Sequence, residues 1–319
     1  MSTTDTGATP QTQPKKTHFN YLLAFDGSPH SLAALELLLD LPERSGIPRQ
    51  NCTLTLMTVL PTQSIGAHEF LQAALDQAQK RMTEAGFETQ AIIKAGNPAA
   101  TLNEYADEIQ ADLILIGAKG LSAVLGILLG GVAQQVVEYS RRPVLVVRAP
   151  YHPIQRVLVM VDGSPSSRDA VEYLGRECPD DSGRRCSWLP LSAELTAMHV
   201  LPPPIEEEPF PRAWALGPEA IYPVTLPPLN KEAIEAGEQK MADKLLDETQ
   251  ALLGESGFAS QRLIVRGDAA EEALKTIKDQ QIDLVVCGSR GLSAISGWLL
   301  GSLSRKLVHY ANCSVLIVK

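Results

Sequence analysis

The sequence predicts an α/β protein made of two tandem, doubly wound domains, each with a five-stranded parallel sheet flanked by helices. Two pairs of segments repeat along the chain: residues 21–29 (YLLAFDGSP) recur as 157–165, and residues 112–123 recur as 283–294. In both copies short Val, Ile and Leu runs alternate with helix-like segments. The apolar runs are continuous, which is typical of parallel strands covered by helices on both faces.

In the first copy the elements alternate from the first strand to the last. We expect strands at 21–25, 53–59, 89–94, 112–116 and 144–147, and helices at 31–40, 67–85, 99–109 and 132–140. The second copy repeats this order, with insertions that the offset between matched residues locates. The offset is 136 for Asp26 and Asp162, 141 for Val59 and Val200, and 171 for Gly117 and Gly288. The second copy has therefore gained residues before its second strand, and more of them after it.

The predicted organisation is a disordered tail at 1–17, a first domain at 18–149 and a second domain at 154–319. The linker is short and holds two prolines, which favours domains packed against each other. The larger insertion, about 201–229, is acidic and rich in proline, as expected of an extended, solvated segment. A partner-binding or lid role and an inert surface loop both remain open for it.

The charge balance excludes several classes of partner. The formal net charge is −9, and an acidic chain without a basic patch is unsuited to nucleic acid or to an anionic membrane surface. No apolar run reaches the roughly 18 residues of a membrane span. The five cysteines form no CxxC pair, which favours a reducing cytoplasm. Cys178 and Cys186, eight residues apart in a loop-like stretch, are expected to be free thiols, with a functional pair as the alternative.

An Asp-Gly-Ser turn follows the opening strand of each copy, and ligands of open parallel sheets bind beyond such strand ends. The glycine allows a tight turn, and the serine can cap the next helix. The aspartate either contacts a ligand or supports the turn alone. The candidate residues are Asp26, Gly27 and Ser28 in the first copy and Asp162, Gly163 and Ser164 in the second.

A glycine-containing loop after the fourth strand is the stronger signal. In the second copy it runs from Gly288 through Arg290 to Gly291, and after nine residues reaches Gly301 and Ser302 at a predicted helix start. Glycines let the backbone approach an anion, and a helix N-terminus offers unpaired N–H groups and a partial positive charge. This is a phosphate-binding pattern, although the Walker sequence GxxxxGK[ST] occurs nowhere in the chain.

The pattern Gly-x2-Gly-x9-Gly-(Ser/Thr) resembles the ATP-binding motif of the universal stress protein family. The resemblance covers about 19–147 and 156–319 and implies Rossmann-like domains of the adenine nucleotide alpha hydrolase type. It assigns adenine contact to Asp162 and Asp26, the walls of the base pocket to Val200, Val59, Cys287 and Ile116, and ribose and phosphate binding to Gly288, Gly291, Gly301 and Ser302 with Leu303 beside them.

The first copy departs from this pattern. Its loop residues are Gly117, Lys119, Gly120, Gly130, Gly131 and Val132. Gly131 replaces the final Ser/Thr, so a hydroxyl is lost and, we expect, a helix cap as well. A hydrogen bond to a charged group contributes about 1.5–3 kcal/mol, or roughly one to two decades of affinity, and Lys119 would compensate in part. We therefore expect a weaker site in the first copy and a tighter one at Ser302.

These observations predict a cytoplasmic ATP-binding protein with a regulatory or sensor role in stress response. One alternative is a slow ATPase with Mg²⁺ near Asp26 or Asp162; others are a binder of AMP, cyclic AMP or cyclic di-AMP, and an interaction protein with vestigial sites. No catalytic set is evident, and His199 lies either near the site or in a structural position. The resemblance also implies that 144–147 and 315–318 join the two sheets edge to edge, and that tandem chains form a homodimer.

Overall fold

The structure is a computed structural model of the 319-residue chain. It describes residues 18–45, 48–61, 68–121, 128–175, 178–179, 185–186, 189–204, 230–291 and 300–319. The predicted tail at 1–17 and most of the predicted insertion, 205–229, lie outside these ranges.

The first half contains the strands and helices that its apolar pattern predicts, with ends that differ by a few residues. They are β1 (Phe19–Ala24), α1 (Pro29–Ser45), η1 (Arg49–Asn51), β2 (Cys52–Leu60), α2 (His68–Glu84), β3 (Glu88–Ala95), α3 (Pro98–Glu108), β4 (Leu113–Gly117), α4 (Gly131–Tyr139) and β5 (Val144–Val147).

The second half repeats this order. Its elements are β6 (Arg156–Met160), α5 (Pro165–Leu174), β7 (Cys178–Pro179), β8 (Arg185–Cys186), β9 (Glu194–Leu201), α6 (Lys231–Glu255), β10 (Ser260–Arg266), α7 (Ala269–Asp279), β11 (Leu284–Gly288), α8 (Ser302–Tyr310) and β12 (Ser314–Val318).

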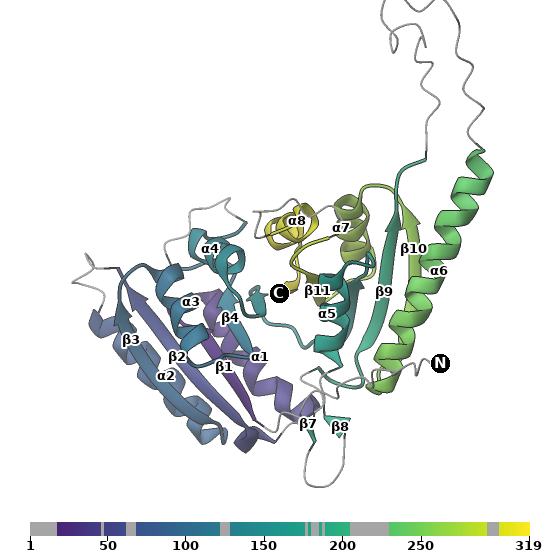
Figure 1. Cartoon of the computed structure of the whole chain (residues 1–319). Coiled ribbons are helices and arrows are strands. Elements are labelled where there is room, and N and C mark those ends of the chain that lie inside the picture. The colour runs from purple at the N-terminus through teal and green to yellow at the C-terminus, as the bar shows by residue number, and fades with distance from the viewer. Residues whose placement is uncertain are drawn as a thin grey trace, which may run out of the picture.

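The two halves form one ten-stranded sheet in the order β10-β9-β6-β11-β12-β5-β4-β1-β2-β3. Figure 1 shows the two halves, with β1 to β4 in the first and β9 to β11 in the second. Within each half of this sheet all neighbouring strands are parallel, and the order is third, second, first, fourth, fifth. This order is that of a doubly wound sheet, so the predicted α/β fold with two copies is confirmed.

The junction between the halves is the antiparallel pair of β5 and β12, as the resemblance implied. Val146 lies opposite Val315, Leu145 opposite Leu316, and Val144 opposite Ile317. Because every other pair in this sheet is parallel, the strands of the two halves run in opposite directions. Ligands of this fold class bind at the carboxyl ends of the strands. In the two halves these carboxyl ends therefore point in opposite directions along the strand axis.

Two hydrophobic layers cover the sheet, and each extends through both halves without a break. One layer packs α1, α2, α5 and α6 against one face, and the other packs α3, α4, α7 and α8 against the opposite face. Leu145 and Leu316 belong to the first layer, and Val144, Val146, Val315 and Ile317 to the second. The junction is therefore part of the core, which supports the prediction that the linker joins packed domains.

The residues gained by the second half do not all lie in loops. Helix α6 has 25 residues, whereas its counterpart α2 has 17, so part of the larger insertion lengthens a helix. The smaller gain falls in the stretch between α5 and β9, where β7 and β8 pair as a two-stranded antiparallel sheet with Cys178 opposite Cys186. The stretch predicted to be loop-like thus holds a small hairpin.

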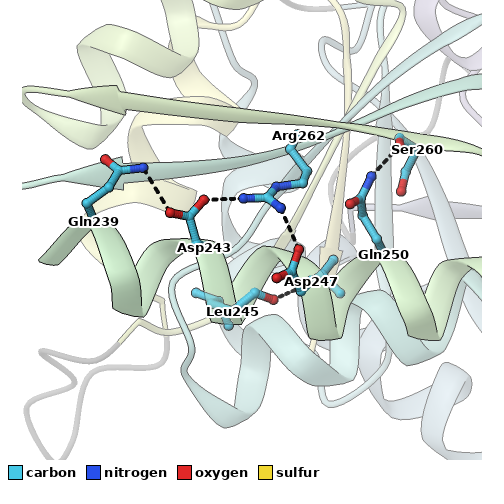
Figure 2. A network of polar contacts seen from close by, with 8 residues as sticks. Gln239, Asp243, Leu245, Asp247, Gln250, Ser260 and Arg262 are labelled. Carbon is cyan, nitrogen blue, oxygen red and sulfur yellow. Dashed lines mark hydrogen bonds and ion pairs between the residues drawn. The ribbon is translucent and has the colours of Figure 1, made fainter. Parts of the chain in front are cut away.

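The outer edge strand β10 is fixed to α6 by polar contacts. The Arg262 guanidinium forms ion pairs with Asp243 and Asp247 of the helix, the second at 2.5 Å (Figure 2). Gln250 donates from Nε2 to the Ser260 carbonyl at 2.6 Å. These contacts hold the outermost strand against the helix that packs on its face.

We expect both halves to unfold in one transition, because their cores are continuous. Replacing buried Leu316 with alanine should lower the free energy of unfolding by about 2–5 kcal/mol. Urea denaturation followed by circular dichroism and by limited proteolysis of each half measures this loss. Met241→Ala, at a side chain that is 76% exposed, is the control and should stay within about 0.5 kcal/mol. Separate transitions for the two halves would contradict the expectation.

Candidate functional site

The Asp-Gly-Ser turn has the geometry that its glycine permits. Gly27 has φ of +74° and Gly163 φ of +79°, in the region that side chains other than glycine rarely adopt. The Asp26 carboxylate accepts a hydrogen bond from the Ser28 N–H at 3.0 Å. The matching bond between Asp162 and Ser164 is 2.9 Å long. Each turn therefore closes on its own aspartate.

The serine of this turn caps the next helix, as predicted. Ser164 is the N-cap of α5, and its hydroxyl oxygen accepts a bond from the Ser167 N–H at 3.2 Å. The same hydroxyl donates to the carbonyl of Arg290 in the glycine loop at 3.2 Å. In the first half the Ser28 hydroxyl donates to the Lys119 carbonyl at 3.1 Å. Both serines are buried, so each ties the turn to the glycine loop.

The aspartate makes a second tie to that loop. In the first half the remaining carboxylate oxygen of Asp26 accepts from the Leu121 N–H at 3.1 Å. A β-carbon at Gly120 would stand 2.7 Å from this oxygen, and one at Gly291 would stand 2.6 Å from the matching oxygen of Asp162. The second glycine of the motif is needed because the carboxylate occupies the space of a side chain.

The first glycine of the motif has a packing role. A β-carbon at Gly117 would lie 2.8 Å from the backbone nitrogen of Ser31, and one at Gly288 would lie 2.4 Å from the backbone carbon of Ser166. These neighbours belong to α1 and α5. The missing side chain therefore lets each helix start directly against the end of β4 or β11.

The third glycine ends the loop and begins the helix. The Gly130 N–H donates to the Ala118 carbonyl at 2.8 Å, and the Gly301 N–H to the Ser289 carbonyl at 2.7 Å. Gly130 and Gly301 are the N-cap residues of α4 and α8, both extended and without a side-chain cap. The prediction that Gly131 removes a helix cap is wrong. Gly131 is the first residue of α4, one position after the cap. Ser302 holds the matching position in α8, where it is exposed.

In the first half these parts enclose a cavity of about 470 Å³, within the size range of small-molecule sites. Nine of the eleven predicted first-copy site residues line it: Asp26, Val59, Ile116, Gly117, Lys119, Gly120, Gly130, Gly131 and Val132. Gly27 and Ser28 do not. Sequence reasoning missed a set of mostly apolar wall residues: Ala24, Phe25, Met57, Leu60, Pro61, Leu71, Pro98, Leu102, Leu121 and Ala133.

The cavity has an apolar part and a part suited to an anion. Strand β2 and helices α2 and α3 contribute the apolar side chains of Met57, Leu71 and Leu102. Lys119 and the N-terminus of α4 supply positive charge and backbone N–H groups. A β-carbon at Gly131 would meet nothing within 4 Å. The arrangement fits a ligand that joins a flat apolar group to an anionic one.

The second half places its predicted residues at the matching positions. Val200 lies half-buried in β9, Cys287 is buried in β11, and Arg290 is exposed after it. Burial raises the pKa of the Cys287 thiol to about 12, so the thiol is neutral at pH 7. The bridge at 292–299 lies outside the described residues.

His199 has a structural position. Its Nδ1 lies 2.7 Å from the carbonyl oxygen of Val161, the residue just before Asp162. In the first half Thr58 holds the matching carbonyl of Phe25 with a 2.6 Å hydrogen bond from its hydroxyl. Both contacts fix the end of the opening strand, and the alternative of a ligand-binding histidine gains no support.

Among the residues that the structure describes, no three His, Cys, Asp or Glu side chains gather in a group suited to a metal ion. No helix in the described ranges is both long and apolar enough to span a membrane.

The fold and site define a tandem α/β protein with a small-molecule cavity built on a glycine loop. The model of the Universal stress protein family matches residues 20–148 and 153–319, and the chain belongs to that family.

Several universal stress proteins match this chain over most of its length. A universal stress protein of Mycobacterium tuberculosis (strain CDC 1551 / Oshkosh) is 25% identical over 96% of each chain, and one of Mycolicibacterium smegmatis is 26% identical over 83% of this chain and 80% of its own length. Among solved structures, a universal stress protein of Archaeoglobus fulgidus superimposes with a TM-score of 0.62 at 20% identity, covering 94% of this chain and 98% of its own. These structural likenesses concern the fold.

The packing role of the first glycine is testable with a matched pair of alanine variants. Gly288→Ala should destabilise the protein by about 1–3 kcal/mol, because its β-carbon would overlap the backbone of α5. Gly131→Ala, which points into open space at the start of α4, should be neutral or stabilising by up to about 1 kcal/mol. Urea denaturation of both variants gives the comparison. Equal stability would refute the packing role.

The neutral state of Cys287 can be checked by thiol labelling, since the thiolate is the reactive species. At pH 8 iodoacetamide should leave Cys287 and the similarly buried Cys313, whose pKa is also raised to about 12, unlabelled in the folded protein. Peptide mass spectrometry should show labelling of both after unfolding in urea. Rapid labelling of Cys287 in the native protein would show that the thiol is accessible and ionised.

Proposed function

We propose that this universal stress protein binds ATP through its glycine loops and acts as a regulator or sensor in stress response. The cavity of the first half carries the proposal, because it joins apolar walls to Lys119 and the N-terminus of α4. An adenine ring would take the apolar part, near Val59 and Ile116. The phosphates would be held by the backbone N–H groups of Gly131 and Val132, in the first turn of α4, and by Lys119.

In the second half the matching residues are Val200, Cys287, Arg290, Gly301 and Ser302, with Leu303 next along α8. Two differences favour tighter binding there. Arg290 offers a planar, multi-donor cation in place of the Lys119 ammonium, and Ser302 adds a hydroxyl at the first position of the helix. The proposal is thus an asymmetric pair of sites.

Binding without rapid hydrolysis is the form that the residues support best. The alternative ATPase places Mg²⁺ near Asp26 or Asp162. Both oxygens of the Asp26 carboxylate already accept backbone N–H bonds, from Ser28 and Leu121, and its role in holding the loop competes with metal binding. Steady release of phosphate that requires Mg²⁺ and disappears in Ser302→Ala would favour the ATPase.

Other adenine nucleotides remain alternatives, since a backbone cradle accepts several phosphate arrangements. A universal stress protein solved in complex with cAMP is 30% identical over 41% of this chain, with a TM-score of 0.33. This local likeness does not decide between ligands. Our proposal also includes a cytoplasmic location and a homodimer of tandem chains.

The direct test is the mass and stoichiometry of any small molecule that co-purifies with the full chain. We expect ATP, at up to two molecules per chain, and a heat of binding when ATP is titrated into protein stripped of ligand. Release of AMP, cAMP or cyclic di-AMP instead would support the alternative ligands. An absence of binding at millimolar ATP would contradict the proposal and would support an interaction protein with vestigial sites.

The hydroxyl at the first position of the helix should account for the difference in ATP affinity between the two sites. Ser302→Ala should weaken the tighter site by roughly 10- to 100-fold, because a hydrogen bond to a charged group is lost. Gly131→Ser, which places a hydroxyl in open space, should strengthen the weaker site by up to a similar factor. Isothermal titration with ATP measures both. Two equal sites in the unmodified protein would contradict the asymmetry.

A further inference from the structure

Arg148 follows β5 and connects the two halves through backbone carbonyls. Its guanidinium donates to the Leu128 carbonyl at 2.9 Å, two residues before Gly130, the N-cap of α4. It also donates to the Val308 carbonyl at 2.7 Å, in the last turn of α8. One side chain therefore holds the segment that leads into Gly130, which lines the first cavity, and the C-terminus of the helix that begins after Gly301.

Lys319 makes the reciprocal contact. It follows β12 as Arg148 follows β5, and its ammonium donates to the carbonyl of Val137 in the last turn of α4. Val137 and Val308 occupy matching positions in their helices. A cation at a helix C-terminus is favourable because the last carbonyls carry a partial negative charge. Burial lowers the pKa of Lys319 to about 8, so the ammonium form prevails at pH 7.

The residue before each cation is hydrogen-bonded to the glycine loop of the same half. The Ala118 N–H donates to the Val147 carbonyl at 2.8 Å, directly before Arg148. The Ser289 N–H donates to the Val318 carbonyl at 2.7 Å, directly before Lys319. The chain of contacts thus runs from each glycine loop, through a cation, to the far end of the helix that begins at the other loop.

The two helices are short enough to act as rigid levers. Helices α4 and α8 each have nine residues, or about 13 Å of axial length. They are also joined by an ion pair of 3.4 Å between Glu138 and Arg305. A shift of α8 along its axis would move the carbonyl that accepts from Arg148, and a shift of α4 would move the carbonyl that accepts from Lys319.

We propose that Arg148 and Lys319 couple the two nucleotide sites, so that filling either site strengthens binding at the other. The proposal rests on the proposed function. A phosphate at the N-terminus of α8 would fix that helix and its C-terminal carbonyls, and with them Arg148. Arg148 in turn would hold the carbonyl of Leu128, two residues before Gly130 of the first site. Because the first ligand orders groups that the second needs, the second pays less of the ordering cost.

The test needs variants that each retain one site. Gly131→Leu and Ser302→Leu place an apolar side chain before the N-terminus of α4 or α8 without adding charge. Both positions are exposed, so the fold should be retained. Titration of ATP at pH 7 should give one molecule per chain and the affinity of a single site for each variant.

Coupling is the ratio of the overall two-site association constant of the unmodified protein to the product of the two single-site constants. Independent sites give a ratio of 1. We expect at least 5, within the range of roughly 5 to 150 that is usual for allosteric coupling. In the Lys319→Met and Arg148→Met backgrounds the ratio should fall toward 1, and Arg148→Lys should restore part of it.

Arg141→Met is the matched control. Arg141 is a cation near the end of α4 whose side chain is 86% exposed and whose ion pair, with Asp107, stays within the first half. Its loss should leave the ratio unchanged. Lys319→Met alone keeps the test valid if Arg148→Met fails to fold, because Lys319 makes a single hydrogen bond across the junction.

A ratio of 1 in the unmodified protein would overturn the coupling, as would a high ratio that survives loss of both cations. Either result would leave the proposed function intact, since ATP would still bind. If ATP binds to none of the proteins, the proposed function fails as well, and the two failures are thus distinguished.

Discussion

The antiparallel pairing of β5 with β12 is the constraint on which the rest of the molecule depends. Each strand is apolar and buried, and each would be an exposed edge if its half stood alone. Pairing removes both edges and makes two cores continuous across the junction. The strands of the two halves run in opposite directions, so the two glycine loops lie at opposite ends of the strands. The helices that follow these loops, α4 and α8, contact each other through an ion pair.

Much of the architecture could be predicted from the sequence because it depends on local patterns and on the repeat. The continuous apolar runs located each strand, and the matched motifs placed Asp26, Gly117 and Gly130 around one cavity. The walls contributed by Leu71 and Leu102 were not predicted, since an apolar residue on an amphipathic helix looks the same whether it faces a core or a cavity. The contacts of Arg148 depend on strand register between distant segments, which no local pattern reports.

The glycine motif combines parts with different physical purposes. Gly117 makes room for a helix, Gly120 makes room for the Asp26 carboxylate, and Gly130 turns the loop into the N-terminus of α4. Of the four motif glycines in the first half, Gly131 alone would place a β-carbon in open space. The main role of the motif is therefore to let a strand, a loop and the N-termini of two helices pack together. The geometry suited to an anion results from that packing. This explains why the cavity persists in the half that lacks the terminal hydroxyl.

Joining both copies in one chain changes what substitution can do to the pair. When two identical chains pair across such a junction, a single genetic change appears on both sides, and the assembly stays symmetric. Here the glycine at position 131 and the serine at position 302 are encoded separately. The β5–β12 junction keeps the two halves at a fixed one-to-one ratio, so each half is free to evolve a ligand affinity of its own while its neighbour preserves the fold.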